Sequence, residues 1–229
     1  MELIKVKGFV IKTIDYDESS KIVYLFSEYG IISVLAKGAK KYKNKKLSFL
    51  ELYNHVECIS TDSSLSILKD YSIIDNYEDI KSDLKKTLWL SYMFEIISKL
   101  PKDIPYKRTY EFLVKLFEKA KTNDLEICAM LMQTKFLPLF GVKPEFNKCV
   151  VCQNKDIISF SIPRGGMVCS KHKESDTNFF DIKKLYYFNI DDDFSLINNI
   201  NKREVFENIS SYYAYHVEIY IKSTASLLF

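Results

Sequence analysis

The sequence predicts an α+β protein of several parts: a small N-terminal β-barrel of five strands, followed by a helical domain that carries an inserted hairpin rich in cysteine. Three observations support this fold class. Apolar residues tend to alternate with polar ones before residue 78, they recur at intervals of three and four after it, and two close pairs of possible metal ligands follow. The parts are expected at 1–77 for the barrel, 78–146 and 176–229 for the two stretches of the helical domain, and 147–175 for the hairpin.

Five segments in the first part have the pattern of short, half-buried strands separated by turns. In the first of them Val6 and Val10 alternate with charged positions, and in the fourth Leu52 and Val56 share one side. Five strands in about 75 residues match the size of a Greek-key barrel of the OB type. The expected strands are LIKVKGFVIKTI, KIVYLFS, IISVLAKG, FLELYNHVECI and LSILKDYSII.

Four helices are expected after the barrel. The segment DIKSDLKKTLWLSYMFEIISKL is apolar around much of its circumference in its second half, which is typical of a buried helix. The next, YKRTYEFLVKLFEKA, places Tyr110, Leu113 and Phe117 on one stripe. A capping pattern from Asn123 to Glu126 predicts the start of the third, NDLEICAMLMQTKFLPLF. The fourth, EVFENISSYYAYHVEIYIKSTASLL, keeps its helical spacing almost to the end of the sequence.

The hairpin contains the pattern Cys149-x2-Cys152-x16-Cys169-x2-His172. Two-residue spacing in a tight turn lets both side chains point at one centre, so two such turns supply four donors to a tetrahedral ion. Zn²⁺ suits this mixture of thiolates and imidazole, and four protein ligands leave no open position for catalysis. Gly165-Gly166 provides the flexible backbone that brings the second pair back to the first. We therefore expect one structural zinc ion per chain in a zinc knuckle.

Other roles of the cysteines fit the sequence less well. A redox Cys-x-x-Cys motif normally opens a helix in a βαβ unit and needs no second pair. A disulfide framework is typical of small secreted chains, whereas this sequence has 229 residues, five Cys and no apolar signal core at its start. The two remaining thiols, Cys58 and Cys128, lie among apolar neighbours and are expected in the core. His55 and His216 are likewise expected to be ordinary packed residues rather than ligands.

A run of lysines is the second functional signal. Residues 1–49 contain ten Lys against five acidic residues, a local net charge of +5 in a chain whose total is +3. A flexible basic loop between strands favours phosphate binding, and Tyr42 within it could stack on a base. A solvated loop without a ligand is the alternative. The residues expected to bind nucleic acid are Lys37, Lys40, Lys41, Tyr42, Lys43, Lys45 and Lys46.

The order and spacing of several segments resemble the bacterial recombination-mediator family RecO along almost the whole chain. These segments are ESSKIVYLFSEYG (18–30), AKGAKK (36–41), FLPLFGVKPEFNKCVVC (136–152), FSIPRGGMVC (160–169) and YHVEIYIKS (215–223). The resemblance implies an OB barrel, a helical domain and a zinc knuckle, in a protein that is not an enzyme. It also implies binding to single- and double-stranded DNA, annealing of complementary strands, and a cytoplasmic, nucleoid-associated location.

The resemblance further implies protein partners. With RecR, the chain would help to load a recombinase onto strands coated by single-stranded DNA-binding protein (SSB), whose C-terminal tail would dock on the apolar helices at 84–100 and 108–119. The family pattern has a fourth Cys where this sequence has His172, and imidazole is an adequate replacement. Two other classes remain open: an OB-fold RNA-binding protein with a structural zinc, and a zinc hydrolase. No His-x-Glu, His-Glu-x-x-His or paired-carboxylate motif supports the hydrolase.

Overall fold

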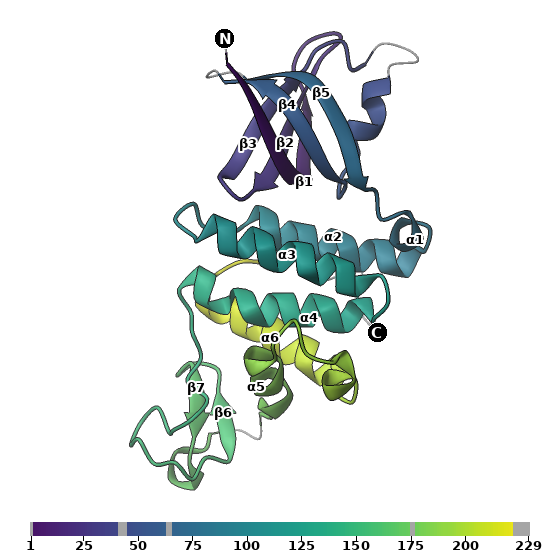
Figure 1. The fold of residues 1–229 in the computed structure, drawn as a ribbon. Coiled ribbons are helices and arrows are strands. Elements are labelled where there is room, and N and C mark those ends of the chain that lie inside the picture. Colours follow the sequence, from purple (N-terminus) through teal and green to yellow (C-terminus); the bar gives the residue numbers. More distant parts are fainter. Residues whose placement is uncertain (1, 41–44, 63–65, 175–176, 222–229) are drawn as a thin grey trace. The chain divides into compact units, whose positions relative to one another are not determined.

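The structure is a computed structural model that describes residues 2–40, 45–62, 66–174 and 177–221 (Figure 1). It contains two compact units. The first comprises Met1–Ser98 and Lys102–Phe117, and the second comprises Lys99–Pro101 and Glu118–Phe229. The change from strands to helices falls at Glu78, so the first unit contains helices as well as the sheet.

Five strands near the N-terminus form a closed barrel, in the order β1-β2-β3-β5-β4. All neighbouring strands are antiparallel except β3 and β5, which pair in parallel at Val34–Ser66 and Leu35–Ile67. The five predicted N-terminal strands are thus confirmed, with corrections to their limits. Their bounds are Leu3–Asp15 for β1, Lys21–Ser27 for β2, Gly30–Ala36 for β3, His55–Thr61 for β4 and Ser66–Asp75 for β5.

The long first strand closes the barrel. Leu3–Phe9 pair with β4 and Gly8–Asp15 pair with β2, and the register with β2 shifts at a bulge between Val10 and Lys12. An extra residue on one strand bends it and increases its twist, which lets one strand serve two neighbours. Among the described residues, the buried interior consists of small and medium apolar side chains and Phe49, with Tyr71 packed against them. The buried residues are Val6, Val10, Val23, Leu25, Val34, Ala36, Ala39, Phe49, Leu50, Val56, Cys58 and Leu68.

The fourth strand is shorter than the sequence predicted. Residues Lys45–Leu50 form the 3₁₀ helix η1 instead, which buries Phe49 in the barrel, and the strand begins only at His55. Between them Tyr53 has a left-handed φ of 73°, which interrupts the extended backbone. The buried Asn54 stabilises this turn because its side-chain amide donates to the Ser48 carbonyl at 2.8 Å. Leu52, expected on the inner face, is therefore exposed.

Helices α1 (Glu78–Lys81) and α2 (Leu84–Ser98) and most of α3 (Tyr106–Ala120) complete the first unit. Where one helix was predicted from residue 79 to residue 100, Asp83 starts a new one, since its carboxylate accepts the Lys86 backbone N–H at 2.9 Å. The second half of α2 is buried around most of its circumference, as predicted.

Aromatic packing joins α3 to the outer face of β1 within this unit. Phe9 stacks on His55 with ring centroids 4.4 Å apart, and Phe117 lies 5.1 Å from Phe9. The His55 Nε2 is 2.7 Å from the Tyr110 hydroxyl, and burial raises the pKa of Tyr110 to about 12. The predicted stripe of Tyr110, Leu113 and Phe117 is buried, and His55 is a packed residue as expected.

The second unit is built around a buried central helix, α4 (Leu125–Phe136). This helix begins after Asp124 rather than Asn123, because the Asp124 carboxylate accepts the Glu126 N–H at 2.9 Å. Helix α5 (Phe180–Tyr187) was not predicted, and α6 (Lys202–His216) is shorter than the predicted last helix, because Glu218 adopts a left-handed φ of 56°. The β-branched side chains that alternate after His216 also disfavour a longer helix. The helices are α4 (Leu125–Phe136), η2 (Leu137–Phe140), η3 (Ser170–His172), α5 (Phe180–Tyr187), η4 (Phe194–Ile197) and α6 (Lys202–His216).

Candidate metal centre and candidate nucleic-acid interface

Two backbone turns bring the four predicted ligands together at the end of the hairpin formed by β6 (Ser159–Ser161) and β7 (Gly166–Val168). In the first turn the Gln153 N–H donates to the Cys149 carbonyl at 2.9 Å, and Gln153 adopts a left-handed φ of 63°. In the second, the His172 N–H donates to the Cys169 carbonyl at 3.0 Å at the end of η3. Each turn therefore presents both of its side chains on the same side.

The ligand atoms are spaced as a tetrahedral metal site requires. All four lie within 4.8 Å of one another. The His172 Nδ1 is 3.6 Å from the Cys149 Sγ and 3.3 Å from the Cys169 Sγ, while the Cys152 and Cys169 Sγ atoms are 3.7 Å apart. Bonds of about 2.3 Å to sulfur and about 2.0 Å to nitrogen would place tetrahedral S–S and S–N pairs roughly 3.8 and 3.5 Å apart. The four residues thus form a group that could hold a metal ion.

Backbone donors prepare the first of these thiols for metal binding. Burial alone would raise the pKa of Cys149, but N–H groups of Cys152, Cys169 and Val151 point at its sulfur and outweigh burial, lowering the pKa to about 6. At Cys152 the Asn154 N–H favours the thiolate, yet burial and the two neighbouring thiols prevail, so that its pKa is raised. An ion at the centre would relieve this mutual repulsion, because thiolates are the form that binds metal.

Metal ligands form much of the interior of this hairpin. Cys149 and Cys169 are buried together with Val168, and only Val150 and Ile157 pack against them among the apolar residues described. Such a cluster is small compared with the core of even a minimal domain. The other two thiols lie elsewhere, and burial raises the pKa of Cys58 to about 11 and of Cys128 to about 12. They are core residues, as the sequence indicated.

Close backbone packing at Gly166 fixes the hairpin against the chain that precedes it. The Met167 N–H donates to the Glu145 carbonyl at 2.8 Å, and the Val150 N–H donates to the Met167 carbonyl at 3.0 Å. A Cβ atom at Gly166 would lie 2.4 Å from the Val150 Cγ1 and 2.9 Å from the Glu145 backbone oxygen. Only glycine allows this approach, because one of the two obstacles is main chain.

We expect Gly166→Ala to loosen the hairpin by about 1–3 kcal/mol, the usual cost of forcing an extra carbon into a packed site. Hydrogen exchange of the amides in residues 145–172 should become faster in this variant. Gly141→Ala is the control for strain without a clash: an added Cβ there meets nothing within 4 Å, and its left-handed φ of 78° should cost about 1–2 kcal/mol at the end of η2 while the amides of residues 145–172 stay protected. Equal protection in the Gly166→Ala variant and the unmodified protein would contradict this account.

Aromatic rings attach the hairpin to the helices of the second unit. Phe160 on β6 stacks face to face on Phe179, with centroids 3.7 Å apart and planes inclined by 4°. Tyr212 on α6 contacts both rings and donates its hydroxyl to the Val142 carbonyl at 3.2 Å. The His216 Nε2 bonds to the Ile162 carbonyl. His216 is therefore a structural contact and not a metal ligand, as the sequence indicated.

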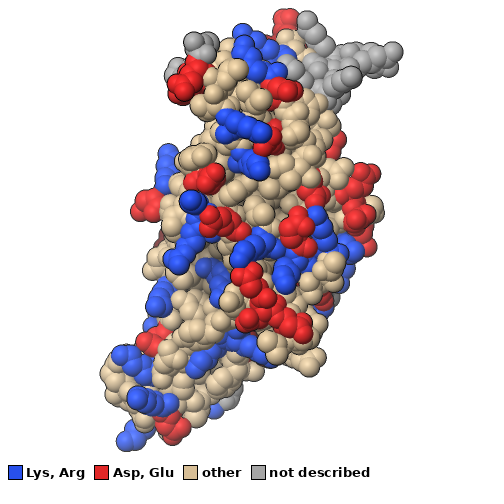
Figure 2. Space-filling view, viewed as in Figure 1, with Lys and Arg blue, Asp and Glu red and all other residues tan. Residues whose placement is uncertain are grey.

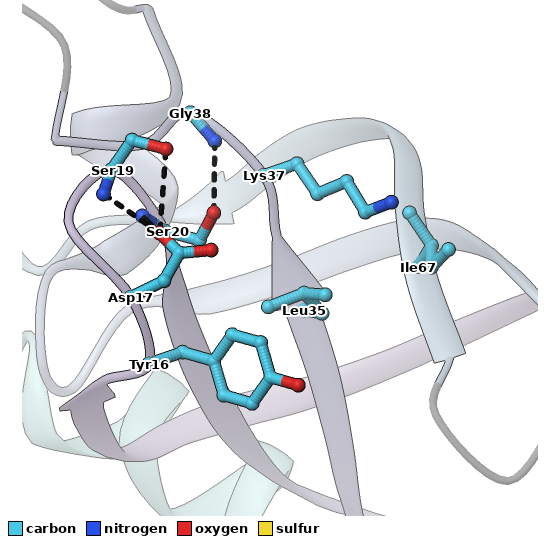
Figure 3. Close-up of a pocket in the computed structure, with 8 residues that line it drawn as sticks. All are labelled: Tyr16, Asp17, Ser19, Ser20, Leu35, Lys37, Gly38 and Ile67. Carbon is cyan, nitrogen blue, oxygen red and sulfur yellow. Dashed lines mark hydrogen bonds between the residues drawn. The ribbon is translucent and has the colours of Figure 1, made fainter.

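A pocket of about 640 Å³ opens at one end of the barrel (Figure 3). It lies between the β1–β2 loop, the end of β3 and the start of β5. The Asp17 carboxylate organises the loop by accepting the N–H groups of Ser19 and Ser20 at 2.7 and 2.6 Å. These bonds hold the pKa of Asp17 below its usual value, chiefly through Ser19. The lining residues are Tyr16, Asp17, Ser19, Ser20, Leu35, Lys37, Gly38 and Ile67.

The lysines that the sequence singled out differ in their surroundings. Lys37 is exposed and lines the pocket. Lys40 is partly buried, and its ammonium group lies 2.9 Å from an Asp15 carboxylate oxygen and donates to the Asp17 carbonyl at 2.8 Å. Lys21 bonds to the same Asp15 carboxylate at 2.8 Å, and the two lysines lower the pKa of Asp15, Lys21 more strongly. Asp15 thus offsets part of the positive charge at this end of the barrel.

The structure describes only part of the remaining basic segment that was predicted to bind nucleic acid. Lys41, Tyr42 and Lys43 lie outside the described residues, and Lys45 and Lys46 lie in η1, where the backbone alone is described. On the face shown in Figure 2, Lys and Arg side chains lie in small groups interspersed with acidic ones. The pocket residues Tyr16 and Asp17 were missed by the sequence analysis, although the turn-forming residues Asp17–Ser20 mark a loop at this position.

The fold and the site define the class of protein: a two-unit α+β protein with an N-terminal β-barrel and a Cys3His hairpin inserted among its C-terminal helices. A family model described as "Recombination protein O N terminal" matches residues 1–77, and one described as "Recombination protein O C terminal" matches residues 81–225. The chain therefore belongs to the RecO family.

Individual relatives agree with this assignment. The DNA repair protein RecO of Bacillus cytotoxicus is 34% identical over 239 residues, which cover 96% of this chain and 94% of that protein. The DNA repair proteins RecO of Bacillus cereus strain AH187 and Bacillus anthracis are each 33% identical with the same coverage. A solved asparaginyl-tRNA synthetase of Entamoeba histolytica aligns with 70% of this chain and 36% of its own at 12% identity, but its TM-score of 0.29 carries no structural argument. None of the described helices is long and apolar enough to cross a membrane.

Proposed function

We propose that this protein is a DNA-binding recombination mediator in DNA repair. The observation that carries the proposal is the match to the RecO family along nearly the whole chain, to relatives named DNA repair proteins. The barrel supplies a compatible surface, because a closed five-stranded barrel with a lysine-rich segment after β3 has the architecture of OB-type modules that bind nucleic acid. We assign the barrel to the OB type and its residues 1–77 to DNA binding.

The mechanism we propose is electrostatic. Lysines at the end of the barrel neutralise phosphates on two strands and release their counterions, which lowers the repulsion between the strands. Base pairing then selects the complementary partner, so the protein needs no active site. The lysines proposed for this role are Lys37, Lys40, Lys41, Lys43, Lys45 and Lys46, with Tyr42 stacking on a base. Lysine suits phosphate contacts, because its ammonium group acts as a point charge rather than a planar fork.

The four-ligand group is proposed to hold one structural Zn²⁺ ion. The mixed thiolate and imidazole donor set and the tetrahedral spacing of Cys149, Cys152, Cys169 and His172 support this metal. When bound, the ion would compensate the charge of the thiolates and fix the hairpin, which lacks a sizeable apolar core of its own. Four protein ligands leave no position for a reacting water, and this argues against the hydrolase alternative.

The proposed partners are single- and double-stranded DNA, RecR and the C-terminal tail of SSB, and the proposed outcome is recombinase loading on SSB-coated strands. We expect the protein to accelerate annealing of complementary SSB-coated strands, and the rate to fall steeply between 50 and 200 mM salt, in line with about six or more phosphate contacts. Fluorescence-resolved annealing with and without the protein, and with RecR added, measures this directly. If the protein neither binds DNA in low salt nor speeds annealing, the proposed function is wrong.

The alternative role as an RNA-binding OB protein differs in one measurable respect. DNA and RNA oligonucleotides of identical sequence would compete differently for the barrel, and a mediator of DNA repair should prefer the DNA. A tenfold preference for RNA would favour the alternative, since the 2′-hydroxyl is the group that separates the two polymers.

A further inference from the structure

The pocket at the end of the barrel combines features that suit one nucleotide of a single strand. Its volume of about 640 Å³ lies in the range of ligand sites, and it opens widely to solvent, which suits a chain passing through better than an enclosed metabolite. Its walls come from the β1–β2 loop and from strands β3 and β5. In OB-type barrels the β1–β2 and β4–β5 loops and the neighbouring strand face are where oligonucleotides bind.

Each half of the pocket has a different chemistry. Tyr16 is 53% exposed and lies beside Leu35 in the wall of the pocket, so its ring is accessible next to the aliphatic Leu35 side chain (Figure 3). Lys37 extends from the end of β3 on the other side of Leu35, toward Ile67 (Figure 3). A base can stack on an aromatic ring, whereas a phosphate seeks an ammonium group.

Asp17 makes the two halves unequal. Its carboxylate is held in place by the Ser19 and Ser20 N–H groups, both bonded to the same oxygen, Oδ1. Asp17 lies on the Tyr16 side of the pocket (Figure 3), and the ammonium group of Lys40, which contacts the same loop, is already paired with Asp15, so this half attracts a phosphate less than Lys37 does. The pocket is therefore not a simple anion trap, and the charge pattern places the phosphate at Lys37 and the base at Tyr16.

We propose that this pocket is a base-stacking subsite for single-stranded DNA, in which Tyr16 receives a base and Lys37 contacts the adjoining phosphate. The proposal rests on the DNA-binding function proposed above and extends it, since it distinguishes single strands from duplexes. Bases in a duplex are stacked on one another and present no free face, so Tyr16 contributes only when the strand is unpaired. Lys37 contributes to both.

Replacing Tyr16 by Ala tests the proposal in the intact chain. We expect the affinity for a dT oligonucleotide to fall roughly 5- to 150-fold, the usual effect of losing one stacking platform, while duplex affinity stays unchanged. Tyr16→Phe keeps the ring and should bind like the unmodified protein. Tyr29→Ala is the matched control, because Tyr29 is 72% exposed in the β2–β3 turn, at the end of these strands away from the pocket.

Salt dependence separates the two roles. In fluorescence anisotropy titrations at several salt concentrations, Tyr16→Ala should shift the line of log K against log salt without changing its slope. Lys37→Gln should reduce the slope for single strands by about 0.7, the value of one lost phosphate contact. An oligonucleotide with abasic positions should lose more affinity for the unmodified protein than for Tyr16→Ala, because the stacking on Tyr16 is already absent in the variant.

These experiments distinguish a failure of the Tyr16 subsite from a failure of the proposed DNA-binding function. If the unmodified protein binds no DNA even in low salt, the DNA-binding function itself is wrong. If it binds, and Tyr16→Ala binds single strands as well as Tyr29→Ala does, the stacking subsite alone is wrong. A loss of single-strand affinity with the expected slopes, in variants whose thermal unfolding is unchanged, supports the subsite.

Discussion

Replacing Lys37, Lys40, Lys41 and Lys43 by Glu is expected to abolish DNA binding without unfolding the protein. Four phosphate contacts to a single strand contribute about 2.8 to the slope of log K against log salt, which corresponds to several hundred-fold in affinity at 0.1 M salt. Charge reversal adds repulsion to this loss. The barrel core contains no lysine among its described residues and Lys37 is exposed, so the fold should persist. Some loss of stability is expected from Lys40→Glu, which replaces the ion pair with Asp15 by two neighbouring carboxylates. Electrophoretic mobility shifts measure binding, and circular dichroism on heating measures stability.

A second variant with the same net charge is the control for this experiment. The control changes four lysines that are exposed in the first compact unit but lie in α2, in α3 or in the loop between them, outside the strands: Lys85, Lys86, Lys102 and Lys107. Their replacement by Glu lowers the total charge equally and should cost much less affinity, since only distant, screened charges change. Unchanged binding in the barrel variant would refute the assignment of these lysines. Lys40 is expected to contribute least, because Asp15 already neutralises it.

Loss of the metal is the second large effect that we expect. The unmodified protein should contain about one zinc per chain by elemental analysis, and Cys149→Ser should lower the affinity for zinc more than 100-fold, because even supporting residues around a metal are worth 10- to 100-fold. Cys149 is fully buried and touches both halves of the site, so the hairpin should open. Hydrogen exchange in residues 145–172 should then rise while DNA binding by the barrel is partly retained.

Two further variants test whether this effect comes from the metal. Cys128→Ala removes a buried thiol of the same unit and should keep the ion, and His172→Cys supplies a fourth thiolate and should also keep it. A metal-free preparation of the unmodified protein that is fully stable would contradict the role of the ion. So would Cys149→Ser protein that retains full zinc.

The sequence predicted most of the strands and helices because their periodicity follows directly from burial. Residues 106–120 were placed correctly because the helix has one apolar face and a clear polar one, and residues 21–27 because a β-branched and aromatic run is bounded by turn residues. The four metal ligands were also found, because spacing in two tight turns is a local property of the chain. The geometry brings all four to within 4.8 Å.

Tertiary contacts explain what the sequence did not reveal. Tyr53 adopts a left-handed φ beside Asn54, whose side chain bonds to the Ser48 carbonyl, and a tyrosine is not a residue type that predicts a left-handed turn. The sequence around Tyr16 indicates only an exposed tyrosine, because it does not show that β3 and β5 lie beside this residue. Parallel pairing of these two strands places Leu35 opposite Ile67, and that long-range register creates the pocket. The roles of the lysines beyond residue 40 remain predictions.

The aromatic contacts of the hairpin also bear on how the molecule is made. A ribosome delivers the chain from its N-terminus, so the last metal ligand, His172, emerges before Phe179, Tyr212 and His216. These three later residues provide the stack and the hydrogen bond that attach the hairpin to the helices. During synthesis the hairpin therefore lacks these contacts until α6 has left the ribosome. A metal ion bound at that stage would hold the two ligand turns together until α6 packs against them.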